Sequence, residues 1–127
     1  MSHRSLLTTL MIDCLDEHFD QSYEFWSGAL GLAGRRPRAG QKYATLGRLE
    51  IPLVVRMQRV HRDPGYHLDI STNDMRAERE RMLANGARAK YRIKRWWVME
   101  DPSGNAFCLI RPEEGFDQYA KEWNDEP

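Results

Sequence analysis

A histidine and an aspartate stand two positions apart in the segment Tyr66-His67-Leu68-Asp69-Ile70. Residues at this spacing in a β-strand lie on the same face of the sheet. An imidazole beside a carboxylate can take up and release a proton in acid–base catalysis. His67 and Asp69 are therefore the catalytic candidates, and the alternative is a hydrogen-bonded polar pair that binds a ligand.

The two cysteines, Cys14 and Cys108, each lie in an apolar, strand-like segment. Two thiols do not make a disulfide framework, so the cysteine content favours a cytoplasmic protein. One interpretation of Cys108 is a nucleophile whose thiol pKa is lowered by His67. The alternative is that the thiol only packs in the interior.

Composition and charge narrow the classes of function. With 127 residues, 41% of them hydrophobic and 30% charged, the chain is expected to fold as one globular domain over residues 1–127. Its 19 basic and 19 acidic side chains cancel, which argues against nucleic acid or an anionic membrane surface as a partner. No apolar run approaches the length of a spanning helix, and no export signal is expected at the N-terminus.

The elements that must position these residues occur twice along the chain. Residues 6–15 predict a strand, and the apolar spacing of Phe19, Tyr23, Trp26 and Leu30 predicts the helix that follows, with Gly31 at its end. Residues 66–72 predict a second strand, and Asp74 caps a second helix over residues 75–85.

Three further strands are predicted after each helix. They cover residues 33–38, 42–46 and 49–57 in the first half and 87–91, 96–100 and 106–111 in the second. The fold class is therefore α+β, with two βαβββ modules over residues 5–60 and 65–112. Pro52 predicts a bulge or an edge position in its strand, because proline has no backbone N–H to donate to a neighbouring strand. A C-terminal helix over residues 115–124 is expected to pack on its own sheet, or alternatively against another subunit.

Superposing the two halves fixes which side chains share a face. Matching Asp16 with Asp74 sets Thr9 against His67 without a gap. Alternation then divides the two strands into a polar face and an apolar face that packs beneath the helices. The polar face contains Thr9, Met11, Asp13, His67, Asp69 and Ser71, and the apolar face contains Leu10, Ile12, Leu68 and Ile70.

One segment makes the family resemblance specific. Asp101-Pro102-Ser103-Gly104-Asn105 precedes the last predicted strand and follows Trp96-Trp97-Val98-Met99. Together with the two-module order over residues 6–112, this resembles the glyoxalase, bleomycin-resistance and dioxygenase proteins of the vicinal oxygen chelate superfamily, in its glyoxalase-like branch. The resemblance implies a half-open mixed β-barrel with a central cleft, and a homodimer.

The resemblance also implies where a metal would bind. Metal-using members of the superfamily place His or Glu at positions that correspond here to Thr9, Ile51, His67 and Cys108. Only His67 has the residue type of such a ligand, so no metal and no other cofactor is predicted. The alternative is a divalent ion held by His67 with Glu50 or Cys108.

The predicted function is metal-independent binding or sequestration of a small organic molecule in the cleft. Either Trp96 or Trp97 must face the interior, because neighbours on a strand point in opposite directions. The alternatives are a lyase or isomerase that uses His67, a divergent metal enzyme, and an interaction module with no ligand. The predicted ligand-binding residues are Thr9, Met11, Asp13, Tyr43, His67, Asp69, Trp96, Trp97 and Cys108.

Overall fold

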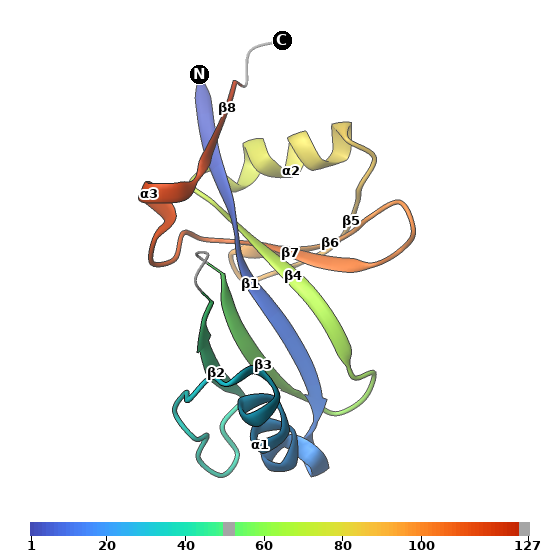
Figure 1. The fold of residues 1–127 in the computed structure, drawn as a ribbon. Coiled ribbons are helices and arrows are strands. Elements are labelled where there is room, and N and C mark those ends of the chain that lie inside the picture. The colour runs from blue at the N-terminus through green and yellow to red at the C-terminus, as the bar shows by residue number, and fades with distance from the viewer. Residues whose placement is uncertain (50–52, 125–127) are drawn as a thin grey trace. The chain divides into compact units, whose positions relative to one another are not determined.

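The computed structural model describes residues 1–49 and 53–124, and the chain forms two compact units (Figure 1). Unit 1 comprises Met1–Thr8 and Leu68–Pro127, and unit 2 comprises Thr9–His67. Two strands, β1 (Ser2–Leu15) and β4 (Gly65–Thr72), contribute residues to both units. Glu50, Ile51 and Pro52, which carried the predicted bulge and two of the proposed metal-ligand positions, lie outside the described residues.

Unit 2 contains a three-stranded sheet and one long helix. After β1 come the 3-10 turn η1 (Asp16–His18), helix α1 (Phe19–Leu30), β2 (Tyr43–Arg48) and β3 (Val54–Val60). The strand order is β2-β3-β1, with β1 parallel to β3 and β2 antiparallel to β3. Within the described part of unit 2, two strands follow the helix where three were predicted.

The predicted strand over residues 33–38 does not form. Gly34 instead lies against the backbone of β2, where a Cβ at this position would overlap the carbonyl oxygens of Thr45 and Leu46. The hydroxyl of Tyr23 donates a hydrogen bond to the Gly34 carbonyl at 2.8 Å. This segment is therefore an irregular connection between α1 and β2. Its backbone is held by the hydrogen bond from Tyr23 and by the close packing of Gly34 on β2.

The core of unit 2 lies between α1 and the sheet, as the apolar spacing predicted. Phe19 and Tyr23 are buried, whereas Leu30 at the end of the helix is 41% exposed. Gly31 ends α1 in the left-handed conformation, with φ of 67°. The buried cluster consists of Ile12, Cys14, Phe19, Tyr23, Ala44, Leu46, Val55 and Met57.

Unit 1 has the predicted order of strand, helix and three strands. Its elements are β4, α2 (Met75–Ala84), β5 (Arg88–Ile93), β6 (Trp96–Glu100) and β7 (Ala106–Ile110). The sheet order is β4-β7-β6-β5, with β4 parallel to β7 and the other pairs antiparallel. Asp74 caps α2 as predicted, since its side chain accepts a hydrogen bond from the Ala77 amide at 3.0 Å.

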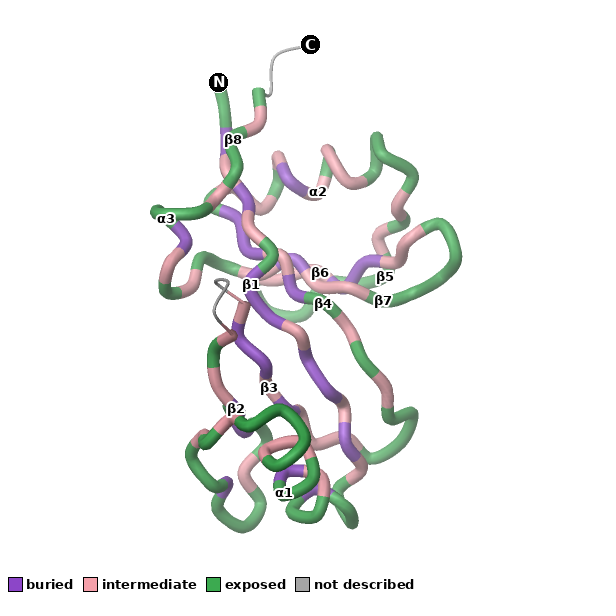
Figure 2. The backbone as a smooth tube through the Cα atoms, in the orientation of Figure 1, coloured by how far each residue is buried: buried purple, intermediate pink, exposed green. Residues whose placement is uncertain are grey.

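Burial departs from the predicted apolar face at one position. Leu68 was expected beneath a helix, but it is 43% exposed, whereas Leu109 in the same sheet is fully buried. Figure 2 shows buried stretches alternating with more exposed ones along β1, while α2 has a single buried residue, Glu78. Within unit 1, helix α2 is thus held by a buried charged side chain, that of Glu78, as well as by apolar packing.

The predicted C-terminal helix over residues 115–124 is wrong. Helix α3 (Phe116–Tyr119) spans four residues, and the chain then becomes extended at Ala120, where ψ is 140°. Strand β8 (Lys121–Asn124) pairs antiparallel with the start of β1, from Ser2 opposite Asn124 to Ser5 opposite Lys121. Apolar residues at helical spacing could not reveal this pairing, because the partner strand is at the other end of the chain.

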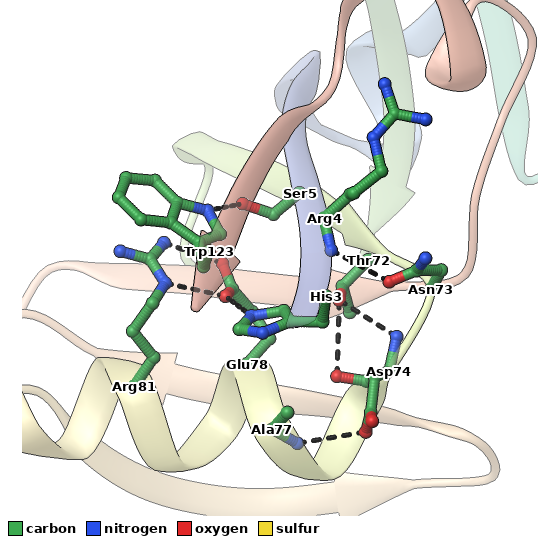
Figure 3. Close-up of polar contacts among 10 residues, drawn as sticks. All are labelled: His3, Arg4, Ser5, Thr72, Asn73, Asp74, Ala77, Glu78, Arg81 and Trp123. Atoms are coloured by element: carbon green, nitrogen blue, oxygen red, sulfur yellow. Dashed lines mark hydrogen bonds and ion pairs between the residues drawn. The ribbon is translucent and has the colours of Figure 1, made fainter. Parts of the chain in front are cut away.

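A buried ionic network joins β1, α2 and β8 (Figure 3). His3 Nε2 donates to Glu78 Oε1 at 2.6 Å, and Arg81 donates to both oxygens of Glu78 at 2.7 and 2.8 Å. The Arg81 guanidinium lies 3.8 Å from the ring centre of Trp123, whose Nε1 donates to Ser5 Oγ at 2.8 Å.

The chemistry of this network favours an ionised Glu78. Burial alone would raise the pKa of Glu78, but hydrogen bonds from Arg81 and His3, the positive charge of Arg81 and a hydrogen bond from Ser5 outweigh burial and hold that pKa below its ordinary value. The carboxylate therefore stays charged and fully paired in the folded state.

Candidate functional site

In unit 2, His67 forms a hydrogen bond with Asp13. The distance from His67 Nδ1 to Asp13 Oδ2 is 3.0 Å, and the side chains are 14% and 17% exposed. An ionised carboxylate can only accept hydrogen bonds, so Nδ1 is the donor. The imidazole in its neutral form then presents Nε2 as an acceptor.

A carboxylate that fixes the orientation of an imidazole has several known chemical uses. The imidazole can serve as a general base, as a hydrogen-bond acceptor for a ligand, or as a metal ligand whose second nitrogen is held in place. Asp13 Oδ1 is buried and has no hydrogen-bond partner among the described residues.

The sheet of unit 2 places further polar residues on the face that carries Asp13. Asp13 is opposite Gln58 on β3, and Gln58 is opposite Tyr43 on β2, so these three side chains form a row. The next row on this face begins with Met11 and continues with Arg56, whose Nε donates to Thr45 Oγ1 at 3.1 Å. Sequence reasoning missed Thr45, Arg56 and Gln58 because the register of β3 against β1 was not known.

The predicted ligand residues on β1 and β2 do share this face, but they differ in accessibility. Ile12 and Cys14 pack towards α1, which leaves Thr9, Met11 and Asp13 on the other side of β1. Thr9 is fully buried and Met11 is 5% exposed, whereas Tyr43 is 41% exposed. Tyr43 and the His67–Asp13 pair are therefore the more accessible parts of the predicted set in unit 2.

In unit 1, Asp69 and Cys108 lie next to each other. They are register partners on β4 and β7, and a carboxylate oxygen of Asp69 is within 4.8 Å of the Cys108 Sγ. Cys108 is in turn opposite Val98 on β6. These side chains share one face of the sheet, on which Asp69 is 5% exposed.

The structure decides which tryptophan belongs to that face. Trp96 precedes Val98 by two residues and shares its face, together with Tyr91, which is opposite Val98 on β5. Trp97 points the other way, where the Arg79 guanidinium of α2 lies 4.4 Å from its ring centre. Of the two tryptophans, Trp96 is therefore the one on the same face as Asp69 and Cys108.

The donors present do not reproduce the metal-ligand set that the resemblance implies. Thr9 is a poor ligand and is fully buried, and Ile51 and Glu50 are outside the described residues. In unit 1, the neighbouring Asp69 and Cys108 offer one oxygen and one sulfur, which are fewer donors than a zinc site requires.

The other cysteine is not a candidate nucleophile. Burial raises the pKa of the Cys14 thiol, a hydrogen bond from Ser22 opposes this, and the charge of Asp13 raises it further. Cys14 also belongs to the buried core of unit 2, and both cysteines are free thiols.

The motif around Asp101 forms a structural turn. The Asp101 carboxylate accepts hydrogen bonds from the amides of Ser103 and Asn105 at 2.9 and 2.8 Å, and from Asn105 Nδ2 at 3.0 Å. These bonds, with those of Asn105 the largest influence, hold the pKa of Asp101 below its ordinary value. The motif therefore forms the turn that leads into β7, the strand that carries Cys108.

A family model described as the glyoxalase-like domain matches residues 9–110. The chain belongs to the glyoxalase-like domain family of the vicinal oxygen chelate superfamily. The glyoxalase-like model stops short of the chain ends, so His3 and Trp123 of the buried network lie outside it. No curated protein matches this glyoxalase-like chain.

Solved structures confirm the predicted α+β fold of this glyoxalase-like protein. Methylmalonyl-CoA epimerase from Mycobacterium tuberculosis is 18% identical with a TM-score of 0.60, over 89% of this chain and 91% of that one. A hypothetical protein from Bacillus halodurans is 12% identical with a TM-score of 0.60, over 87% and 96%. The Streptomyces coelicolor methylmalonyl-CoA epimerase, in complex with 2-nitronate-propionyl-CoA, is 15% identical with a TM-score of 0.54, over 83% and 95%. Among the described residues, none of the helices has the length and apolar character needed to cross a membrane.

Proposed function

We propose that this glyoxalase-like protein binds a small organic molecule on the face that carries His67, without a metal ion, in a binding or sequestering role. The observation that supports this most is the His67–Asp13 hydrogen bond at 3.0 Å. It fixes the imidazole of a partly exposed histidine, so that Nε2 can accept a hydrogen bond from a ligand at little entropic cost.

The surroundings of the pair suit an organic ligand. Tyr43 and Gln58 continue the row of Asp13 across the sheet of unit 2 and supply a ring and an amide. Rings with a few polar groups are the usual lining of small-molecule sites.

An enzyme is the second candidate, because a carboxylate-oriented imidazole is also a general base. In this alternative His67 Nε2 abstracts a proton from the substrate while Asp13 stabilises the resulting imidazolium, and Asp69 is a further acid or base on the same face of β4. The structurally similar epimerases are described as acting on methylmalonyl-CoA, which makes a lyase or isomerase the reaction class to test.

A divalent metal ion is the third candidate, favoured by the carboxylate of Asp69 and the thiol of Cys108, which lie next to each other in unit 1. Elemental analysis of the purified protein, after dialysis against metal-free buffer, tests it. One equivalent of a divalent ion, lost in Cys108→Ser, would contradict the metal-independent proposal. Less than about a tenth of an equivalent is the expected result.

The binding proposal is tested with a panel of small aromatic and carbonyl compounds in ligand-observed NMR. We expect compounds that bind the wild-type protein and lose at least tenfold in affinity with His67→Ala, since the variant removes the oriented acceptor. His61→Ala is the matched control, because His61 is an exposed histidine that directly follows the end of β3 at Val60. Circular dichroism must show that both variants are folded.

Hits that bind His67→Ala as tightly as the wild type would contradict the proposal. Turnover of a hit, lost in His67→Ala with folding intact, would favour the enzyme over sequestration. The predicted homodimer and cytoplasmic location belong to the same proposal, and sedimentation equilibrium of the purified chain tests the dimer.

A further inference from the structure

Positive charge is concentrated on the β5–β6 hairpin of unit 1. No acidic residue occurs between positions 86 and 99, and the basic residues there are Arg88, Lys90, Arg92, Lys94 and Arg95. The next acid along the chain, Glu100, pairs with Arg88 and Lys90. Because the whole chain has no net charge, this hairpin is a local positive field that attracts anions.

Two arginines flank Trp97 on one face of this hairpin. The Arg79 guanidinium of α2 lies 4.4 Å from the centre of the Trp97 ring. Arg92 is opposite Trp97 on β5, so its side chain is on the same face of the sheet. Helix α2 lies over this part of the sheet and contacts β5 (Figure 1). Both arginines are therefore neighbours of the same indole ring.

Within the described part of the chain, no carboxylate pairs with either arginine. Arg79 is half-buried and makes no hydrogen bond or ion pair with the described residues. Its Nε is buried, whereas its two terminal nitrogens are not, so a ligand can reach them. Arg92 is exposed, and its Nε donates to the Lys94 carbonyl at 3.0 Å. A half-buried cation without an anion is destabilising, and a bound anion removes that cost.

We propose that Arg79 and Arg92 bind the phosphate group of a phosphate monoester on the α2 side of the β5–β6 hairpin. A phosphate dianion matches two guanidiniums in charge, and its oxygens accept paired hydrogen bonds from them. Stacking on Trp97 fixes the Arg79 side chain before binding, which reduces the entropy lost. This site shares no residue with the function proposed above and goes beyond it.

The same features argue against other ligand classes. A cation would be repelled by the basic hairpin. A neutral molecule would leave both guanidiniums without an anion, and a carboxylate monoanion balances the charge of only one of them. For three probes that share one ring, we therefore expect phenyl phosphate to bind most tightly, benzoate second and phenol last.

Titrations of the full chain with these probes at one ionic strength, followed by protein-observed NMR, test this order. Saturable shifts with phenyl phosphate are expected at the Arg79 Nε–H and the Trp97 indole N–H signals. Benzoate should bind about fivefold more weakly, since it lacks the second charge. Equal affinities for benzoate and phenyl phosphate, or shifts that chloride reproduces, would overturn the proposal.

The same titration with a phosphoserine tripeptide distinguishes two sources of the phosphate group. Tighter binding of the peptide than of phenyl phosphate would assign the group to a phosphorylated protein. Tighter binding of phenyl phosphate would assign it to a small metabolite. Either result supports the anion site, whereas the absence of saturable shifts with both would overturn it.

Variants separate a specific site from the general field of the hairpin. Arg79→Gln and Arg92→Gln should each weaken phenyl phosphate about tenfold, the value of one hydrogen bond between charged groups. The matched control is Arg76→Gln, which removes the same charge from α2 at a side chain that is 90% exposed and paired with Glu80. It should change the affinity less than about twofold, because exposed charges are screened.

Arg92→Gln keeps the test decisive if Arg79→Gln does not fold, because Arg92 is exposed. Equal weakening in Arg76→Gln and in the folded site variant would show a general field, and would reject the site. That failure is distinguishable from failure of the function proposed above, which is read from His67→Ala with a different panel.

Discussion

The molecule contains two histidine–carboxylate pairs that are built from the same chemistry and differ in their surroundings. In unit 1, His3 and Glu78 are 1% and 0% exposed and 2.6 Å apart. In unit 2, His67 and Asp13 are 14% and 17% exposed and 3.0 Å apart. Both pairs connect side chains that are far apart in the sequence.

The number of other partners separates the two pairs. Glu78 receives two hydrogen bonds from Arg81 in addition to that from His3, so its carboxylate is saturated. Asp13 Oδ1 has no such partner in the described part of the chain. A saturated and fully buried pair can only hold the fold together, whereas a pair with partly exposed side chains can take part in binding.

The largest effect is expected when the saturated pair is broken. Glu78→Ala leaves Arg81 and His3 without their anion in the interior, and should lower the free energy of unfolding by about 3–5 kcal/mol. Urea denaturation measures this. Glu80→Ala is the matched control on the same helix, because Glu80 is 62% exposed and its pair with Arg76 contributes about 0.5 kcal/mol or less. Equal losses in the two variants would remove the distinction.

Acid should weaken the same network. The pKa of Glu78 is lower in the folded chain than its ordinary value, against the effect of burial, because Arg81 and His3 favour the carboxylate. Its contribution to stability is therefore complete above the ordinary value of about 4.3, and is lost as the pH falls through the lowered folded value. Urea unfolding between about pH 6 and pH 3 should show this loss, and Glu78→Gln should show a flatter profile. A Glu78→Gln profile parallel to the wild type would contradict this assignment.

A smaller effect is expected from the ring that covers Arg81. Trp123→Leu removes the contact with the guanidinium and the hydrogen bond to Ser5, and should cost about 1–2 kcal/mol. Trp123→Phe keeps a ring and loses only the hydrogen bond, so about half of the loss should be recovered. A helical C-terminus, as the sequence predicted, would instead make both substitutions nearly neutral.

The smallest effect on stability is expected at the other pair. His67→Ala removes one partly exposed hydrogen bond, with a loss of about 1 kcal/mol or less in urea denaturation. Its main effect should appear in the binding assay described above. A loss as large as that of Glu78→Ala would show that His67 is structural, and the functional proposal would then lose its basis.

The sequence predicted the local and repeated features well. The spacing of Phe19 and Tyr23, the cap at Asp74 and the alternation around Ile12 all depend on neighbours within a few residues, and the structure confirms them. The strand at residues 33–38 and the C-terminal helix were wrong, because a close backbone contact at Gly34 and the pairing of β8 with β1 depend on distant segments.

The candidate site was predicted in part for the same reason. Alternation placed Asp13 and His67 on predicted polar faces, yet it could not show that they bond to each other, since this contact joins β1 to β4. The faces of the two tryptophans could not be assigned from the sequence either, because they depend on the contact of Arg79 with Trp97. Buried networks such as that of His3 and Glu78 carry no local sequence signal.

The most direct test of the central claim reads both pairs in one spectrum. With histidine-labelled protein, the imidazole signals of all 4 histidines can be followed while a compound from the panel is added. The proposed function predicts that the His67 signals shift to saturation and the His3 signals do not move. A compound that binds while His67 stays unchanged, or that shifts His3 instead, would contradict it.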